Sequence, residues 1–140
     1  RLLDLRRVFG LRSCVNTVCR MLNPGAASAS VQGVFHPSYR LLQADAAALL
    51  GLNGLTVIKG GGGEFERHPS KEIAAFGLRQ GRSWEATFPA LCDETRRLSS
   101  DTARTWAHQT PTAFEAEIIT GTKALALDTL GIPDTAEQAA

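Results

Sequence analysis

A strand–helix–strand pattern between positions 31 and 59 constrains the fold of this chain more than any other feature. Residues 31–35 and 55–59 are short apolar runs that each predict a strand. Between them, residues 38–50 carry an apolar stripe at helical spacing, with Pro37 in the first turn and Gly51 after the last. Short connections of this kind predict two parallel strands joined by a right-handed crossover. The expected fold class is therefore α/β, with a parallel sheet and flanking helices.

The rest of the chain divides into short elements separated by turn residues. The expected elements are helices over 1–9, 14–22, 38–50 and 111–130, and strands over 31–35, 55–59, 73–78 and 84–88. Gln80-Gly81 fits a hairpin turn between the last two strands. One partial domain over 1–140 is expected, with a βαβ core and short strands (1–89), a polar connection (90–110) and C-terminal helices (111–140). Because Arg1 opens directly into an amphipathic pattern, we expect a piece of a longer protein.

The composition limits which classes of partner the chain is expected to bind. The 15 Lys and Arg residues against 14 Asp and Glu give a net charge of +1, so any attraction to nucleic acid must come from local arrangement. No apolar run approaches the ~20 residues that span a bilayer, and no membrane partner is expected. The three cysteines Cys14, Cys19 and Cys92 match neither a disulfide framework nor a metal spacing. Reduced thiols and a cytoplasmic location are expected.

Four polar residues lie where a ligand could reach them. Arg12 and Asn16 are four apart at the start of a predicted helix, which places them on one face. A guanidinium there could bind a carboxylate or phosphate, or only pair locally. His36 follows the first predicted strand and Lys59 ends its parallel neighbour, at the edge where such sheets bind ligands. The alternative for His36 is a packed or helix-capping side chain.

A glycine run and two acids follow the second predicted strand. Residues 60–63 are four glycines, but 64–67 alternate like a strand, which favours a flexible loop over a phosphate-binding loop. Glu64 and Glu66 would then point to the same side and could share one cation. The alternative is a solvated strand edge.

Three motifs occur in a set order: G-x-R-S-x-x-N at 10–16, L-N-P-G-A at 22–26 and G-V-F-x-P at 33–37. Together they resemble the anthranilate phosphoribosyltransferase-like family (glycosyl transferase family 3), and residues 120–131 match more loosely. The resemblance implies part of a large domain of the nucleoside phosphorylase/phosphoribosyltransferase type. It also implies that the full-length protein is a homodimer.

The resemblance assigns roles to several of these residues. The arginine that matches Arg12 contacts the carboxylate of an aromatic acceptor, and Asn16 lies beside it. An Asp-Glu pair that binds Mg²⁺ in the family aligns with Phe65 and Glu66, so half of it is lost and Glu64 is the nearest substitute. Mg²⁺ is the one cofactor implied, and only for an enzyme. The family's donor-binding motifs, G-T-G-G-D and N-x-S-T, do not occur in this chain.

Two functions follow from the resemblance. One group within the family is resembled more closely, through His36-Pro37, Lys59-Gly60 with the glycine run, and Glu64-x-Glu66-Arg67-x-Pro69. Some members of this second group are similar to a nucleic-acid binder. The first hypothesis is that single-stranded DNA or RNA binds in the former substrate cleft through Arg12, Asn16, His36, Lys59 and Arg67. The alternative is phosphoribosyl transfer in the full-length protein, from a phosphoribosyl pyrophosphate donor to an aromatic acceptor. A purely structural remnant is a third interpretation. Phe65 favours binding.

Overall fold

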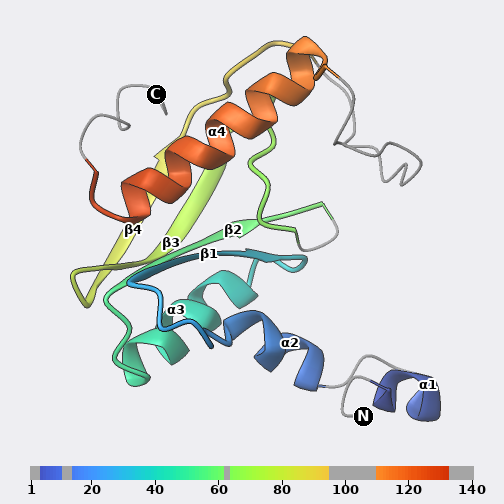
Figure 1. Cartoon of the computed structure of the whole chain (residues 1–140), viewed down its shortest axis with the longest axis vertical. Coiled ribbons are helices and arrows are strands. Elements are labelled where there is room, and N and C mark those ends of the chain that lie inside the picture. The colour runs from blue at the N-terminus through green and yellow to red at the C-terminus, as the bar shows by residue number, and fades with distance from the viewer. Residues whose placement is uncertain (1–3, 11–13, 62–63, 95–109, 133–140) are drawn as a thin grey trace.

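In a computed structural model the chain forms a four-stranded mixed sheet with helices on both faces (Figure 1). The structure describes residues 4–10, 14–61, 64–94 and 110–132. The helices are α1 (Leu5–Phe9), α2 (Cys14–Met21), α3 (Tyr39–Leu49) and α4 (Ala113–Thr129). The strands are β1 (Ala29–Val34), β2 (Gly54–Lys59), β3 (Ile73–Arg79) and β4 (Arg82–Phe88), in the spatial order β1-β2-β3-β4. The α/β class predicted from the sequence is confirmed.

The pairing of the strands corrects one expectation. β1 and β2 are parallel, in register from Ala29 opposite Gly54, and α3 connects them as the βαβ pattern predicted. β2–β3 and β3–β4 are antiparallel, so the sheet is mixed and not wholly parallel. The reason lies in the connection from β2 to β3: residues 64–72 contain no helix, and a parallel return needs a long crossover, usually helical. The predicted hairpin is present, with positive φ at Gln80 and Gly81.

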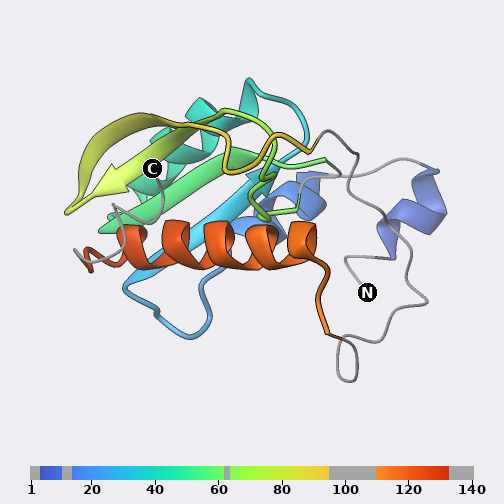
Figure 2. The same ribbon diagram turned by 90° about the horizontal axis from the view of Figure 1, so that it is seen from above.

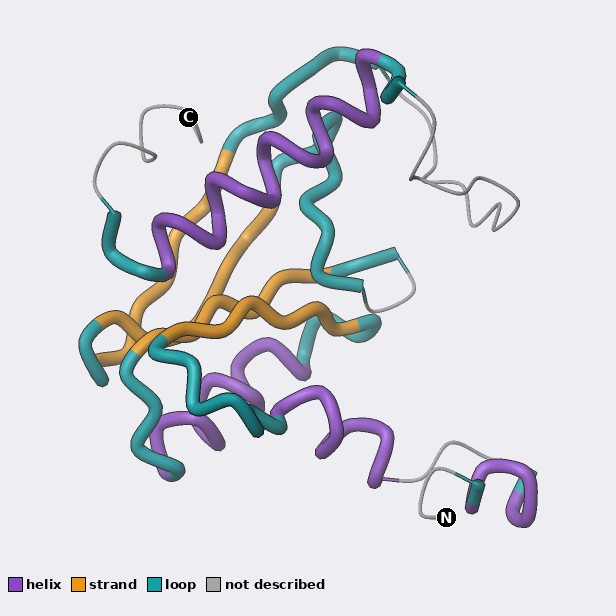
Figure 3. Tube along the Cα trace, viewed as in Figure 1, coloured by secondary structure: helices purple, strands orange, loops and turns teal. Residues whose placement is uncertain are grey.

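The core lies on both faces of β2, because side chains alternate along a strand. Leu55 and Val57 pack with β1 and α3 residues in one cluster. Ile58 packs with Leu125 and β3 residues in the other. Figure 2 shows α4 along one side of the strands and α3 on the other, and Figure 3 shows that α2 shares the α3 side. The two faces are therefore separate environments, and the site described below belongs to the α2–α3 face.

Polar contacts cap the first turn of α4 and join its last turns to the sheet. The side chain of Thr112 caps the first turn, accepting from the Glu115 amide at 3.3 Å, so the helix starts slightly later than its sequence predicted. Near the other end, Arg79 forms a salt bridge with Asp128 at 2.6 Å, and its guanidinium carbon lies 3.7 Å from the centre of the Trp84 ring.

Within the residues that the structure describes, every helix is too short or too polar to span a bilayer.

Candidate ligand site between α2 and α3

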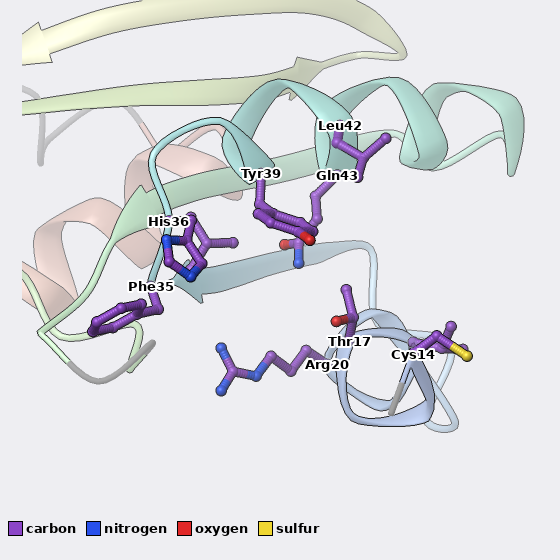
Figure 4. A pocket seen from close by; sticks show the side chains of 10 residues that line it. Cys14, Thr17, Arg20, Phe35, His36, Tyr39, Leu42 and Gln43 are labelled. Carbon is purple, nitrogen blue, oxygen red and sulfur yellow. The ribbon is translucent and has the colours of Figure 1, made fainter. Parts of the chain in front are cut away.

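A cavity of about 580 Å³ lies between α2, α3 and the carboxyl end of β1 (Figure 4). Its lining combines apolar, aromatic and polar side chains, namely Cys14, Thr17, Val18, Arg20, Val34, Phe35, His36, Tyr39, Leu42 and Gln43. This volume falls in the range of roughly 300–1,000 Å³ in which small-ligand pockets occur. The position is also the one where open α/β sheets bind ligands, outside the carboxyl ends of parallel strands.

Three aromatic rings meet where β1 turns into α3. The turn is closed by Tyr39, whose amide donates to the carbonyl oxygen of His36 at 3.0 Å. The Phe35 and His36 rings are 4.8 Å apart edge to face, and the His36 and Tyr39 rings are 6.1 Å apart. Phe35 is 50% exposed and Tyr39 40% exposed. These three residues, the ring cluster, present aromatic surface to a ligand at the end of the cavity.

Arg20 forms part of the opposite wall. Its Nη1 donates to the carbonyl oxygen of Gly33 at 3.2 Å, which ties the last turn of α2 to β1. In Figure 4 its guanidinium extends from α2 toward the side on which Phe35 and His36 lie. A cation therefore lies across the cavity from the ring cluster. Sequence reasoning did not single out Arg20, because nothing local in the sequence shows that the last turn of α2 reaches β1.

Gln43 is the most buried polar side chain of the cavity. It is 2% exposed, and its Oε1 has no hydrogen-bond partner among the described residues. In Figure 4 its amide points from α3 toward the side of the cavity formed by α2. Burying an amide oxygen without a donor costs about 1–3 kcal/mol, so such groups are rare in folded proteins. The sequence did not point to Gln43, because the buried face of α3 is Gln43, Ala44 and Ala47, whereas Leu42 and Leu49 of the predicted apolar stripe are exposed.

The structure brings together two of the predicted site residues. His36 lines the cavity, and exposed Lys59 ends β2 directly opposite Val34 in the parallel register. Lys59 is outside the cavity lining but lies at the neighbouring strand end, as the parallel pairing predicted. Arg12 lies outside the described residues. Asn16 belongs to α2, and its side chain is likewise outside what the structure describes.

Arg67 was expected to contact nucleic acid, but the structure buries it. Its side chain is fully buried, and its Nη2 donates to the carbonyl oxygen of Pro89 at 2.7 Å. The guanidinium carbon lies 5.3 Å from the centre of the Phe88 ring, and the backbone amide of Arg67 donates to Thr122 on α4. Burial lowers the pKa of this guanidinium. Arg67 joins α4 to the end of β4 and has no surface to offer a ligand.

We expect Arg67→Ala to lower the free energy of unfolding by about 2–4 kcal/mol, because it removes a buried stem, a stacked guanidinium and a hydrogen bond. Arg82→Ala is the matched control, since Arg82 is exposed on β4; a change within about 0.5 kcal/mol is expected there. Urea unfolding followed by circular dichroism measures both. Equal effects of the two substitutions would contradict the packing role of Arg67.

The two glutamates do not form the expected strand edge. Glu64 and Glu66 are exposed in a segment without regular secondary structure. The Glu64 backbone packs directly on the strand ends, so that a Cβ on Gly33 or Gly60 would overlap its carbonyl oxygen. Across the described ranges, His, Cys, Asp and Glu side chains form no group of three or more that could bind a metal ion. The described residues therefore do not fit a protein-held magnesium site, and we derive no metal-dependent step.

Comparison with known proteins adds one relative. No model of a known protein family matches the chain. A protein of Aquifex aeolicus (strain VF5), described only as an uncharacterized protein, is 39% identical over 89 residues. The matched region is 64% of this chain and 28% of the relative. The chain thus spans less than a third of the length of the curated relative it matches.

Proposed function

We propose that this chain binds single-stranded nucleic acid at the α2–α3 cavity and the adjoining ends of β1 and β2. The observation that carries the proposal is the exposed ring cluster of Phe35, His36 and Tyr39, with Arg20 in the lining of the same cavity and Lys59 at the end of the neighbouring strand. Aromatic rings on which bases stack, combined with cations that follow the phosphates, are what proteins use to bind single strands without a duplex to read.

The ring cluster supplies the stacking surface. A base needs one exposed aromatic face, and stacking on it is worth about 1–3 kcal/mol per base. Phe35 and Tyr39 are both substantially exposed although each is a large apolar side chain. Their exposure where they line the cavity leaves both rings accessible to a base.

Arg20 and Lys59 supply the charge. Arg20 approaches the ring cluster from α2, and Lys59 reaches the same edge from β2. The net charge of +1 means that affinity comes from these local cations and not from the field of the whole chain. Each phosphate contact releases counterions, so binding should weaken steeply as salt is added.

The family resemblance supports the same proposal. The second group of anthranilate phosphoribosyltransferase-like proteins, which the motifs resemble, implies nucleic-acid binding in a former substrate cleft, within a homodimeric full-length protein with a phosphoribosyltransferase-type large domain. Phosphoribosyl transfer is the weaker candidate. Phe65 occupies the position of a magnesium-binding aspartate in the family pattern, and Glu64 and Glu66 alone do not complete a metal site.

We expect the chain to bind a fluorescent single-stranded oligonucleotide at low salt with micromolar affinity that falls with salt. Lys59→Ala should weaken binding about threefold to tenfold and reduce the slope of log affinity against log salt by about 0.7, the share of one phosphate contact on a single strand. Fluorescence anisotropy across a salt series measures both quantities.

The matched control for this prediction is Lys123→Ala, which removes an exposed lysine from α4 on the opposite face of the sheet. Its affinity and salt slope should equal those of the unmodified chain. Absence of binding at low salt would overturn the proposed function. An equal loss in both variants would place the binding surface elsewhere.

A further inference from the structure

We infer that the α2–α3 cavity holds one base of the bound strand and selects adenine, with Gln43 reading the exocyclic amino group. The inference rests on the proposed function and goes beyond it, because stacking and phosphate contacts alone carry no base preference. It assigns a specificity-determining residue to the cavity.

The buried amide oxygen of Gln43 requires a hydrogen-bond donor from the ligand. Gln43 lines the cavity, and its buried Oε1 accepts no hydrogen bond from the described residues. Removing such an oxygen from water without a partner is unfavourable, and a ligand that supplies an N–H recovers that loss. A protein that keeps an amide at the floor of a cavity of about 580 Å³ has space for the ligand that completes it.

The surroundings of Gln43 indicate what kind of donor enters. Tyr39 lies one helical turn before Gln43 on α3, so both face the same cavity. A flat ring lying against Tyr39 and His36 at the mouth would therefore direct its edge toward the Gln43 amide. The exocyclic amino group is the donor that projects farthest from a base ring, and it would reach the Oε1 first.

Adenine and cytosine both place an amino group beside an unprotonated ring nitrogen, and adenine has the larger ring to stack on Tyr39 and His36. The adenine amino group donates to the amide oxygen while the adjacent ring nitrogen accepts from the amide nitrogen, a two-bond pairing that glutamine and asparagine use to recognise adenine. Thymine presents carbonyl oxygens at its edge, which oppose a buried Oε1. The cavity thus favours adenine over an identical ring that lacks the amino group.

The test compares two oligothymidine strands that differ in one central base, adenine or unsubstituted purine. The unmodified chain should bind the adenine strand about fivefold more tightly, the effect of one hydrogen bond to a buried group. In Gln43→Met, which keeps the length of the side chain and removes the amide, the ratio of the two affinities should fall to about one. Anisotropy titrations at one fixed low salt concentration give the ratio.

Gln32→Met is the matched control. Gln32 is also buried, and its Oε1 also lacks a partner among the described residues, but it lies on β1 outside the cavity lining. The fivefold ratio should persist in this variant. Thermal unfolding should show both variants folded, because each substitution removes a buried amide oxygen that has no partner among the described residues and keeps the length of the side chain.

Each outcome decides between the two proposals. Salt-dependent binding with equal affinity for both strands would overturn the adenine inference and leave the proposed function standing. No binding of either strand at low salt would overturn both. A ratio that persists in folded Gln43→Met would remove Gln43 from base selection. A strand with N6,N6-dimethyladenine tests the same contact without any variant: it has no amino hydrogen to donate, and binding as tight as adenine would overturn the inference.

Discussion

Gly77→Ala is expected to destabilise the protein by about 3 kcal/mol or more. Gly77 lies in the middle of β3, opposite Thr56 of β2, and is buried. A Cβ at this position would overlap the carbonyl oxygen of Leu55 and lie 2.7 Å from its carbonyl carbon. Both obstructing atoms are backbone of the neighbouring strand, so no side chain can move aside. The alternative is to separate β2 from β3, the pairing that joins the βαβ unit to the hairpin.

The expected loss is a large part of the 5–15 kcal/mol by which domains are usually stable. Gly25→Ala is the control, because a Cβ there meets nothing within 4 Å and the backbone φ is ordinary. That variant should lie within about 0.5 kcal/mol of the unmodified chain or slightly above it. Chemical denaturation with far-ultraviolet circular dichroism compares them. A Gly77→Ala protein as stable as Gly25→Ala would mean that β2 and β3 are not paired as described.

The local features of this fold were predictable from the sequence, and the long-range ones were not. The βαβ unit and the hairpin at Gln80-Gly81 were predictable, because periodicity and turn chemistry are local properties. The antiparallel pairing of β2 with β3 was not predicted, although residues 64–72 lack the helix that a parallel return usually needs. The need for glycine at position 77 is invisible in the sequence, since it arises only once Leu55 of another strand lies against it.

Sequence reasoning likewise placed some residues of the candidate site correctly and others not. The location of His36 and Lys59 at one edge of the sheet was predictable, because the ends of parallel strands must lie together. Arg67 was assigned to the surface because an arginine beside acidic residues has no sequence mark of burial; its partners, Pro89 and Phe88, are 22 and 21 positions away in the chain. Gln43 was missed because the predicted apolar stripe of this helix is not its buried face: Leu42 and Leu49 are 57% and 91% exposed, whereas Gln43, Ala44 and Ala47 are buried.

Tyr39→Leu is expected to weaken binding of single-stranded oligonucleotide by roughly tenfold to a hundredfold, the loss of one base stacked on an aromatic ring. The substitution removes the ring and keeps an apolar side chain with good helix propensity at the first position of α3. Because Tyr39 is 40% exposed, stability should change little. Tyr39→Phe retains the ring and should bind within about twofold of the unmodified chain.

The salt dependence separates this effect from that of the cations. Tyr39→Leu changes no charge, so its affinity should be lower at every salt concentration with an unchanged slope, whereas Lys59→Ala lowers the slope itself. Leu49→Ala is the control on the same helix, since Leu49 is 91% exposed and lies outside the cavity lining. If Leu49→Ala weakened binding as much as Tyr39→Leu, the apolar surface of α3 and not the ring cluster would be the contact. If Tyr39→Leu bound normally while Lys59→Ala did not, the site would recognise phosphates without stacking a base, and the cavity would need another ligand to explain Gln43.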